Sequence, residues 1–283
     1  FSQFLAEGDA GSQSPSNGLL CSTCHSDLET FATVELDSFS FPNGVVIESV
    51  GDASNLCATC HSGHSTKQTV DDAITAESYG FKNVHYLPAA GVLYGSDGTV
   101  GYEYDGNTYA AKSSHMVTKC IECHSAQNTE HSFDVHDNEA YCLGCHSTEA
   151  TALAEIRGGN TDDYDGDGDA TESLADEIHT LSDVLYAEIQ AVATTNGFPI
   201  IYSSSNYPYF FKDTNANGVA DEGEASYSNK YADWTPALMK AAFNYQLSIK
   251  EHGAWAHNFS YMTQLLIDSI EDLGRDVTGY TRP

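Results

Sequence analysis

The chain has 283 residues, a length that suits one large domain or two small ones. It carries 11 Lys and Arg residues against 41 Asp and Glu residues, which gives a formal net charge of −30. This charge disfavours binding to nucleic acids or to anionic membranes through bulk electrostatics. An acidic surface instead attracts cations and basic partners, or simply keeps the protein well solvated.

All eight cysteines fall into four Cys-x-x-Cys pairs, and a histidine follows each pair directly. The cysteines are Cys21, Cys24, Cys57, Cys60, Cys120, Cys123, Cys142 and Cys145, and the histidines are His25, His61, His124 and His146. Cys-x-x-Cys-His is the attachment signature of c-type haem. Two thiols one helical turn apart can form thioethers with both vinyl groups of a porphyrin, and the next side chain then reaches the iron. We therefore expect four covalently bound haems with these histidines as proximal ligands.

Zinc ribbons and thiol redox centres also use Cys-x-x-Cys pairs. Neither needs a histidine directly after each pair. Because 12 of the 283 residues are histidine, four such neighbours arise by chance with a probability on the order of 10⁻⁶. Haem is therefore favoured, and it leaves no cysteine for a disulfide framework.

Residues 1–150, which hold all four motifs, are poor in long apolar runs and rich in small polar residues. Such a segment buries too little apolar surface to offset its chain entropy, whereas four haems supply a large apolar core. We predict a multihaem cytochrome c fold in which irregular coil and short α-helices wrap the haems. Residues 151–283 show helical periodicity, which predicts a more helical C-terminal region that covers haems and donates one distal ligand.

Each haem iron has two axial positions, and the motif histidines fill one of them. The other histidines outnumber the three methionines, so we expect histidine on both sides and low reduction potentials. The predicted distal ligands are His85 in an apolar segment, His115 before the third motif, His131 between the third and fourth motifs, and His257 before a helical pattern.

The remaining histidines are predicted to have other roles. His179 points away from the apolar face of its helix, which favours a surface position. His64 follows its motif too closely to reach the opposite face of the same haem. His252 lies at a helix end, where a histidine favours the helix dipole without any metal. His136 is the alternative to His131.

Three helices are predicted in the C-terminal region. The first covers residues 171–193, with Asp169 and Glu172 as a capping pair. The second begins at Thr235-Pro236, an N-cap followed by proline at the first helical position. The third follows His257 and has apolar residues at helical spacing.

Two acidic loops of this region resemble calcium-binding loops. The 213–224 loop has oxygen ligands at positions 1, 3, 5, 9 and 12 and glycine at position 6. Its predicted calcium ligands are Asp213, Asn215, Asn217, the Val219 carbonyl, Asp221 and Glu224. The 163–169 loop offers Asp163, Asp165, Asp167 and Asp169. Its twelfth position is Leu174, so Glu172 or Asp176 would have to substitute, and a loop without any ion is an equal alternative.

Several segments together resemble a known family. They are the four haem motifs, Asn83-Val-His85-Tyr-Leu, Trp234-Thr-Pro-Ala-Leu, Lys240-Ala-Ala-Phe-Asn-Tyr and Gly253-Ala-Trp-Ala-His257-Asn. In these the chain resembles exported multihaem cytochromes of metal-reducing bacteria, above all the OmcE-like tetrahaem cytochromes that polymerise into extracellular nanowire filaments. The resemblance spans most of the chain. It implies bis-histidine haems in a closely spaced row and subunits that stack head to tail.

The function expected from these features is electron transfer, not catalysis, by an extracellular protein. The chain begins at Phe1 rather than Met, as a mature protein does after signal removal, and no stretch approaches the length of a membrane-spanning helix. The expected partners are further copies of the chain, other cytochromes and extracellular electron acceptors. Alternatives are a soluble periplasmic shuttle and a multihaem reductase of a small nitrogen or sulfur compound, and the alternative locations are the periplasm and the cell surface. Surplus distal histidines disfavour the reductase.

Overall fold

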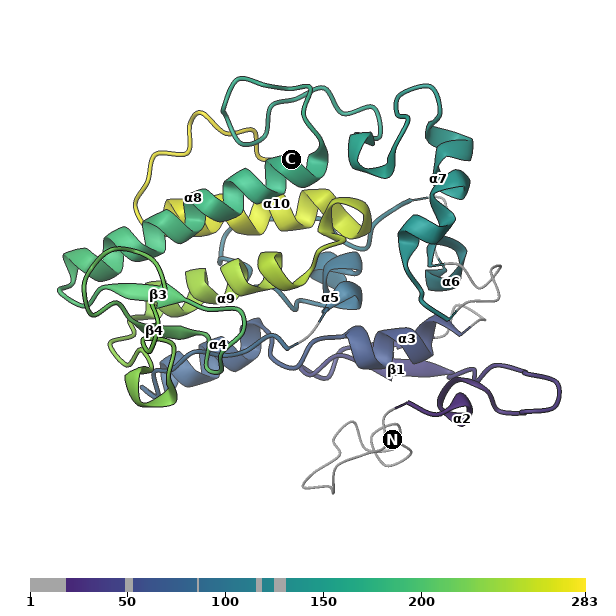
Figure 1. Ribbon diagram of the computed structural model, residues 1–283, viewed down its shortest axis with the longest axis horizontal. Coiled ribbons are helices and arrows are strands. Elements are labelled where there is room, and N and C mark those ends of the chain that lie inside the picture. The colour runs from purple at the N-terminus through teal and green to yellow at the C-terminus, as the bar shows by residue number, and fades with distance from the viewer. Residues whose placement is uncertain (1–18, 49–52, 86, 116–118, 125–130) are drawn as a thin grey trace.

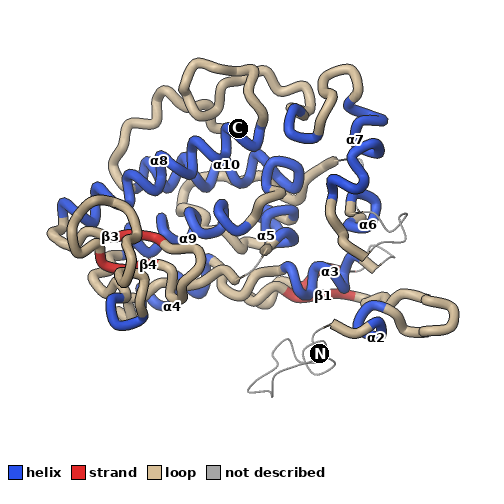
Figure 2. The backbone as a smooth tube through the Cα atoms, in the orientation of Figure 1, coloured by secondary structure: helices blue, strands red, loops and turns tan. Residues whose placement is uncertain are grey.

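The computed structural model describes residues 19–48, 53–85, 87–115, 119–124 and 131–283. In this part of the chain, helices and irregular loops dominate, and the strands form two small antiparallel pairs (Figures 1 and 2). The predicted fold class is confirmed: the structure is mostly helical and irregular, with few short strands, and it carries four Cys-x-x-Cys pairs.

Short helices carry the four haem motifs, as the sequence predicts. They are α2 (Cys21–Cys24), α3 (Ser54–His61), α6 (Cys120–Cys123) and α7 (Glu139–His146). The other described elements before residue 156 are strands β1 (Ser38–Ser40) and β2 (Val46–Glu48), helices α4 (Lys67–Thr75) and α5 (Ala89–Leu93), and the 3-10 turns η1 (Gly95–Asp97), η2 (Val135–Asn138) and η3 (Leu153–Glu155). Strands β1 and β2 pair with Phe39 opposite Ile47.

Three long helices form the C-terminal region. They are α8 (Leu174–Thr195), α9 (Pro236–Lys250) and α10 (Ala254–Asp272), and they pack against one another (Figure 1). Between α8 and α9 lie the paired strands β3 (Ile200–Tyr202) and β4 (Phe210–Lys212) and the 3-10 turn η4 (Tyr227–Asn229). None of the helices in the described residues is long and apolar enough to cross a membrane.

The first long helix starts later than predicted. It begins at Leu174 because Ser173, not the predicted capping pair, is its N-cap: the Ser173 hydroxyl accepts a hydrogen bond from the Asp176 amide at 3.0 Å. The Asp169 carboxylate instead accepts from the Thr171 amide at 2.9 Å and closes a turn ahead of the helix. A side chain that bonds its own loop is not free to cap a helix.

The other two long helices start at or near the predicted residues. Thr235 caps α9 as predicted, since its hydroxyl accepts from the Leu238 amide at 3.3 Å. Helix α10 begins at Ala254, so His257 lies in its first turn rather than ahead of it. The backbone of Asn258, with φ −166° and ψ 80°, interrupts the helix directly after this histidine. The break gives His257 a direction independent of the rest of α10.

Buried amide side chains fasten the long helices to the motif-bearing half. Asn244, which is fully buried on α9, accepts from the Tyr102 N–H at 2.7 Å and donates to the Tyr102 carbonyl at 2.9 Å. Gln246 of the same helix accepts from the Val84 amide at 3.1 Å. The main hydrophobic core accordingly contains residues from both sides of residue 150. Such bonds hold the segment before His85 in a fixed place against α9.

Candidate haem-binding site

Each motif histidine is oriented by a hydrogen bond at Nδ1. The partners are the carbonyl oxygens of Phe31 (2.8 Å from His25), Leu87 (2.8 Å from His61) and Phe133 (2.9 Å from His124), and the Glu149 carboxylate for His146. An imidazole that donates through Nδ1 carries its free lone pair on Nε2, and a metal-bound histidine usually makes such a bond. All four rings are therefore set to bind a metal through Nε2.

The three residues that supply these carbonyl groups share two features. The backbones of Phe31, Leu87 and Phe133 are left-handed, with φ of 55°, 41° and 54°, a conformation that residues with side chains rarely adopt. Their side chains are 62%, 49% and 47% exposed. Backbone strain gathers at functional sites, and exposed apolar groups beside each of these histidines fit a large apolar macrocycle that covers them.

Three motif histidines face a second histidine at a characteristic spacing. Two imidazoles that bind one metal ion from opposite sides, through bonds of about 2 Å each, have ring centroids about 6.3 Å apart. The observed separations are 6.2 Å for His25 and His131, 6.1 Å for His124 and His257, and 6.3 Å for His146 and His115. The residues present therefore fit three irons held between pairs of histidines.

The partner of His124 is held most firmly. His257 Nδ1 lies 2.8 Å from a carboxylate oxygen of Glu251, which is 3% exposed. Burial lowers the pKa of His257, but the hydrogen bond to Glu251 and its charge raise it overall. A carboxylate behind a histidine fixes the ring and makes it a stronger metal ligand. Trp255 packs on the small apolar cluster around Leu153, which anchors this turn to the region of the fourth motif.

The histidine of the second motif has a different environment. All 12 histidines lie in the described part of the chain, and no ring contact joins His61 to any other of them. His85 faces His64 instead, with ring centroids 5.8 Å apart. Both rings belong to exposed residues, and the His85 backbone is left-handed with φ 79°. The structure thus brings His85 near the second motif without pairing it to His61.

The other histidines lie on the surface. The His179 side chain is 73% exposed, as predicted, and lies 3.7 Å from Asp183. The His136 side chain is 76% exposed and bonds to Asp134 at 2.8 Å. His252 is exposed directly after the C-cap of α9. It is His131 rather than His136 that lies beside a motif histidine.

The four motifs follow one another in space in the order of the chain. The Cys57 and Cys120 thiols are hydrogen-bonded to each other, and Cys24 and Cys142 lie near enough to Cys60 and Cys123 to contribute, after burial, to the raised pKa of those thiols. The contact with Cys120, together with burial, raises the pKa of the Cys57 thiol. Because each haem is attached through its thiols, neighbouring thiols imply that successive haems would lie close together.

The two acidic loops share one hydrogen-bond frame. In each, the aspartate at position 1 accepts from the glycine amide at position 6, at 2.7 Å between Asp213 and Gly218 and 2.8 Å between Asp163 and Gly168. Both glycines have positive φ, of 83° and 97°. A glycine in this position makes the sharp turn of a calcium loop.

The predicted ligands of the two loops are nevertheless arranged differently. In the 213–224 loop, Asp221 accepts from two asparagine side chains, and Glu224 accepts from the Thr214 and Asp221 amides. Among the described residues, three or more acidic oxygens gather within 4.8 Å only around the 163–169 loop. The groups are Asp163, Asp165 and Glu177, and Asp165, Asp167 and Glu172. Asp169 belongs to neither group.

The chain is similar in sequence to two polyhaem cytochromes of Geobacter sulfurreducens. The C-type polyheme cytochrome OmcC of Geobacter sulfurreducens is 33% identical over 216 residues, which cover 68% of this chain and 26% of that protein. The C-type polyheme cytochrome OmcB, in two strains of the same species, is 30% identical over 270 residues, 86% of this chain and 34% of that protein. This chain is a distant homologue of polyhaem c-type cytochromes. It spans 26% to 34% of the length of these relatives.

No family model matches the chain, and no solved structure does either. The relationship to polyhaem cytochromes therefore rests on the sequence similarity and on the four motifs.

Several positioning residues have only weak sequence signals. Glu149 follows His146 at a spacing of three, in the turn directly after α7, and Glu251 stands near His257 in the chain. Phe31 and Phe133 act through their carbonyl groups, which any residue could supply. Only the folded backbone reveals these two.

Proposed function

We propose that this chain transfers electrons through four covalently attached c-type haems. Three pairs of histidines at the spacing of bis-imidazole metal ligands carry the proposal. When bound, each haem supplies an iron that takes up and releases one electron. The cysteines of the four motifs attach the haems, and the histidines at Nε2 hold the irons and exclude other ligands.

The histidine pairs favour a carrier over an enzyme. A haem reductase needs an axial position that a substrate can occupy, whereas a second histidine blocks that position. Bis-histidine haems also lack the methionine ligand that raises the potential of many cytochromes. We therefore propose low-potential carriers in a row that follows the order of the motifs.

A redox titration tests this function. Optical titration of the purified protein should show reversible uptake of one electron per haem, with all transitions at low potential. Reduced protein should bind no carbon monoxide at the three paired sites. Rapid carbon monoxide binding to most haems, together with turnover of nitrite or hydroxylamine, would support the reductase instead.

We further propose that the protein is exported and polymerises head to tail, as its resemblance to nanowire cytochromes suggests. c-Type haem is attached outside the cytoplasm. Exposed apolar side chains are frequent in the motif-bearing half, among them Leu19, Leu20, Leu28, Val46 and Tyr141. Haems cover some of them, and a neighbouring subunit gives the rest a partner. Other cytochromes and extracellular acceptors are the proposed redox partners.

The haem of the second motif is the proposed junction between subunits. The Nδ1 of His61 is hydrogen-bonded to the Leu87 carbonyl, yet no second histidine ring among the described residues faces His61. We propose that a neighbouring subunit donates the sixth ligand there. A head-to-tail contact uses two different surfaces, so a donor far from His61 suits it, and the exposed His136, His179 and His252 are candidates. The alternative is that His85 or His64 of the same chain donates this ligand, and the experiment must distinguish that origin from a neighbouring subunit.

Alanine variants of these five histidines distinguish the two origins. If the ligand comes from a neighbour, one variant among His136, His179 and His252 should give monomers with four haems, one of them high-spin. His85→Ala and His64→Ala should then still form low-spin filaments. The ligand is intramolecular if His85→Ala makes one haem high-spin. The filament proposal fails if, in addition, the wild-type protein stays monomeric at high salt. Electron microscopy and the high-spin absorption band provide the two readouts.

We also propose that calcium stabilises the 213–224 loop. Asp213 and Glu224 are 7% and 8% exposed, and without an ion these carboxylates rely on backbone amides and the Thr214 hydroxyl. A bound cation stabilises the folded state by mass action, so removal of calcium should loosen this loop and leave haem ligation intact. Glu224→Gln should abolish one calcium site in a binding titration.

A further inference from the structure

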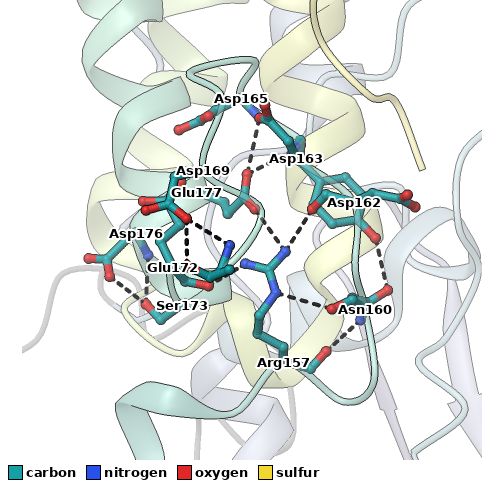
Figure 3. Close-up of polar contacts among 12 residues, drawn as sticks. Arg157, Asn160, Asp162, Asp163, Asp165, Asp169, Glu172, Ser173, Asp176 and Glu177 are labelled. Atoms are coloured by element: carbon teal, nitrogen blue, oxygen red, sulfur yellow. Dashed lines mark hydrogen bonds and ion pairs between the residues drawn. The ribbon is translucent and has the colours of Figure 1, made fainter.

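Three carboxylates converge just ahead of α8. Oxygen atoms of Asp165, Asp167 and Glu172 all lie within 4.8 Å of one another. Figure 3 shows Glu177 between Arg157 and Asp165, and the Arg157 guanidinium also donates to the backbone carbonyl of Glu172. Calcium binds oxygen ligands at 2.3–2.6 Å, so two ligands on opposite sides of the ion lie at most about 5.2 Å apart. The three side chains are therefore close enough to share one ion.

One of these carboxylates is buried and only partly satisfied. Asp165 is 4% exposed, its Oδ1 accepts from the Asp167 amide at 3.0 Å and the Thr180 hydroxyl lies nearby, but its Oδ2 makes no well-formed hydrogen bond in the described structure. The buried Oε1 of Glu172 likewise makes none. Buried anionic oxygens without donors are costly unless a cation neutralises them.

The neighbouring acidic group has a different role. Both oxygens of Glu177, which is fully buried, are already occupied: Oε1 accepts from Arg157 at 2.9 Å, and Oε2 accepts from the Tyr164 and Asp165 amides at 2.8 and 3.1 Å. Asp163 accepts from two glycine amides of its own loop. These groups hold the backbone in place, and the guanidinium of Arg157 repels a cation from that side (Figure 3).

We propose that Asp165, Asp167 and Glu172 bind a divalent cation of the calcium type. The ligands are carboxylate oxygens only, which selects a hard ion over zinc or copper. Glu172 takes the place that Leu174 cannot fill at the twelfth position of the loop. Asp163 and Asp169, which the sequence suggested as ligands, instead stabilise turns of the loop. The site is independent of the haems and of the proposed function.

The ion would also secure the C-terminal tail. Tyr164 of the same loop accepts at its carbonyl from the Thr281 amide at 3.2 Å. Gly166 approaches the tail so closely that a Cβ there would lie 2.5 Å from the Gly279 carbonyl oxygen. A loop that is ordered by an ion on one side therefore gives the tail a firm surface on the other.

Calorimetric calcium titration of the chelator-treated holoprotein tests the site. The titration uses a Glu224→Gln background, so that the 213–224 loop contributes no binding. Calcium should bind once, and magnesium much more weakly. Asp167→Asn, at an exposed position that leaves the fold intact, and Glu172→Gln should each weaken calcium binding at least about tenfold. Asp169→Asn is the matched control, and it should bind calcium as tightly as the Glu224→Gln background protein does.

Proteolysis supplies a second readout. Calcium should slow cleavage of the C-terminal tail in the background protein and in Asp169→Asn, but not in Asp167→Asn or Glu172→Gln. Absence of calcium binding to the background protein at millimolar concentration, or equal binding by Glu172→Gln and Asp169→Asn, overturns the proposal.

Discussion

His257→Ala should convert one of the four haems from low-spin to high-spin in both redox states. His257 lies opposite His124 at the spacing of two ligands on one metal, and Glu251 fixes its ring. Alanine offers no donor atom, so one axial position opens. A quarter of the haem absorption should therefore change, and reduced protein should gain one site for carbon monoxide.

Matched variants make this prediction specific. His131→Ala and His115→Ala should each change one further haem, because their rings face His25 and His146. His257→Met should restore a six-coordinate haem with a raised potential, since methionine ligation raises potentials. An unchanged low-spin spectrum in His257→Ala, measured by magnetic circular dichroism, would mean that this histidine does not bind the iron.

Glu177→Ala should destabilise the folded holoprotein by about 3–5 kcal/mol, because loss of one partner leaves a buried charge without compensation. Glu177 is fully buried, and its carboxylate accepts hydrogen bonds from Arg157 and from the Tyr164 and Asp165 amides. Arg157 is itself only 10% exposed and would remain a buried cation beside unpaired donors. Denaturant unfolding followed by far-UV circular dichroism measures the change.

A surface ion pair between α8 and the segment after α10 provides the control. Glu188 bonds Arg275 at 2.7 Å, but the Arg275 side chain is 43% exposed. Exposed pairs of this kind contribute about 0–1 kcal/mol, so Glu188→Ala should have little effect on the free energy of unfolding. Equal effects of the two substitutions would show that the buried pair does not hold the loop before α8.

Local sequence patterns predict the chemistry of this chain well. Cys-x-x-Cys-His needs only five consecutive residues in one helical turn, so the short motif helices follow from the sequence alone. Thr235-Pro236 likewise sets the start of α9 through local bonds. The start of α8 was predicted too early because Asp169 and Ser173 are both good caps, and the choice depends on which of them the preceding loop occupies.

Long-range pairing is harder to predict. His115, His131 and His257, three of the four histidines predicted as distal ligands, lie beside a motif histidine, but the sequence could not say which one. His131 meets His25 of the first motif although it follows the third in the chain. His85 illustrates the limit: its apolar segment predicts a distal ligand, yet its ring faces His64 and not a motif histidine.

Mass spectrometry of the denatured, purified protein tests the central claim most directly. Thioether bonds survive denaturation, so the chain should carry the mass of four haems in addition to its own 30.5 kDa. Peptide mapping should locate one haem on each Cys-x-x-Cys-His motif. A chain with the mass of the polypeptide alone, with bound zinc in the native state or with haem that acid extraction removes, would contradict the account.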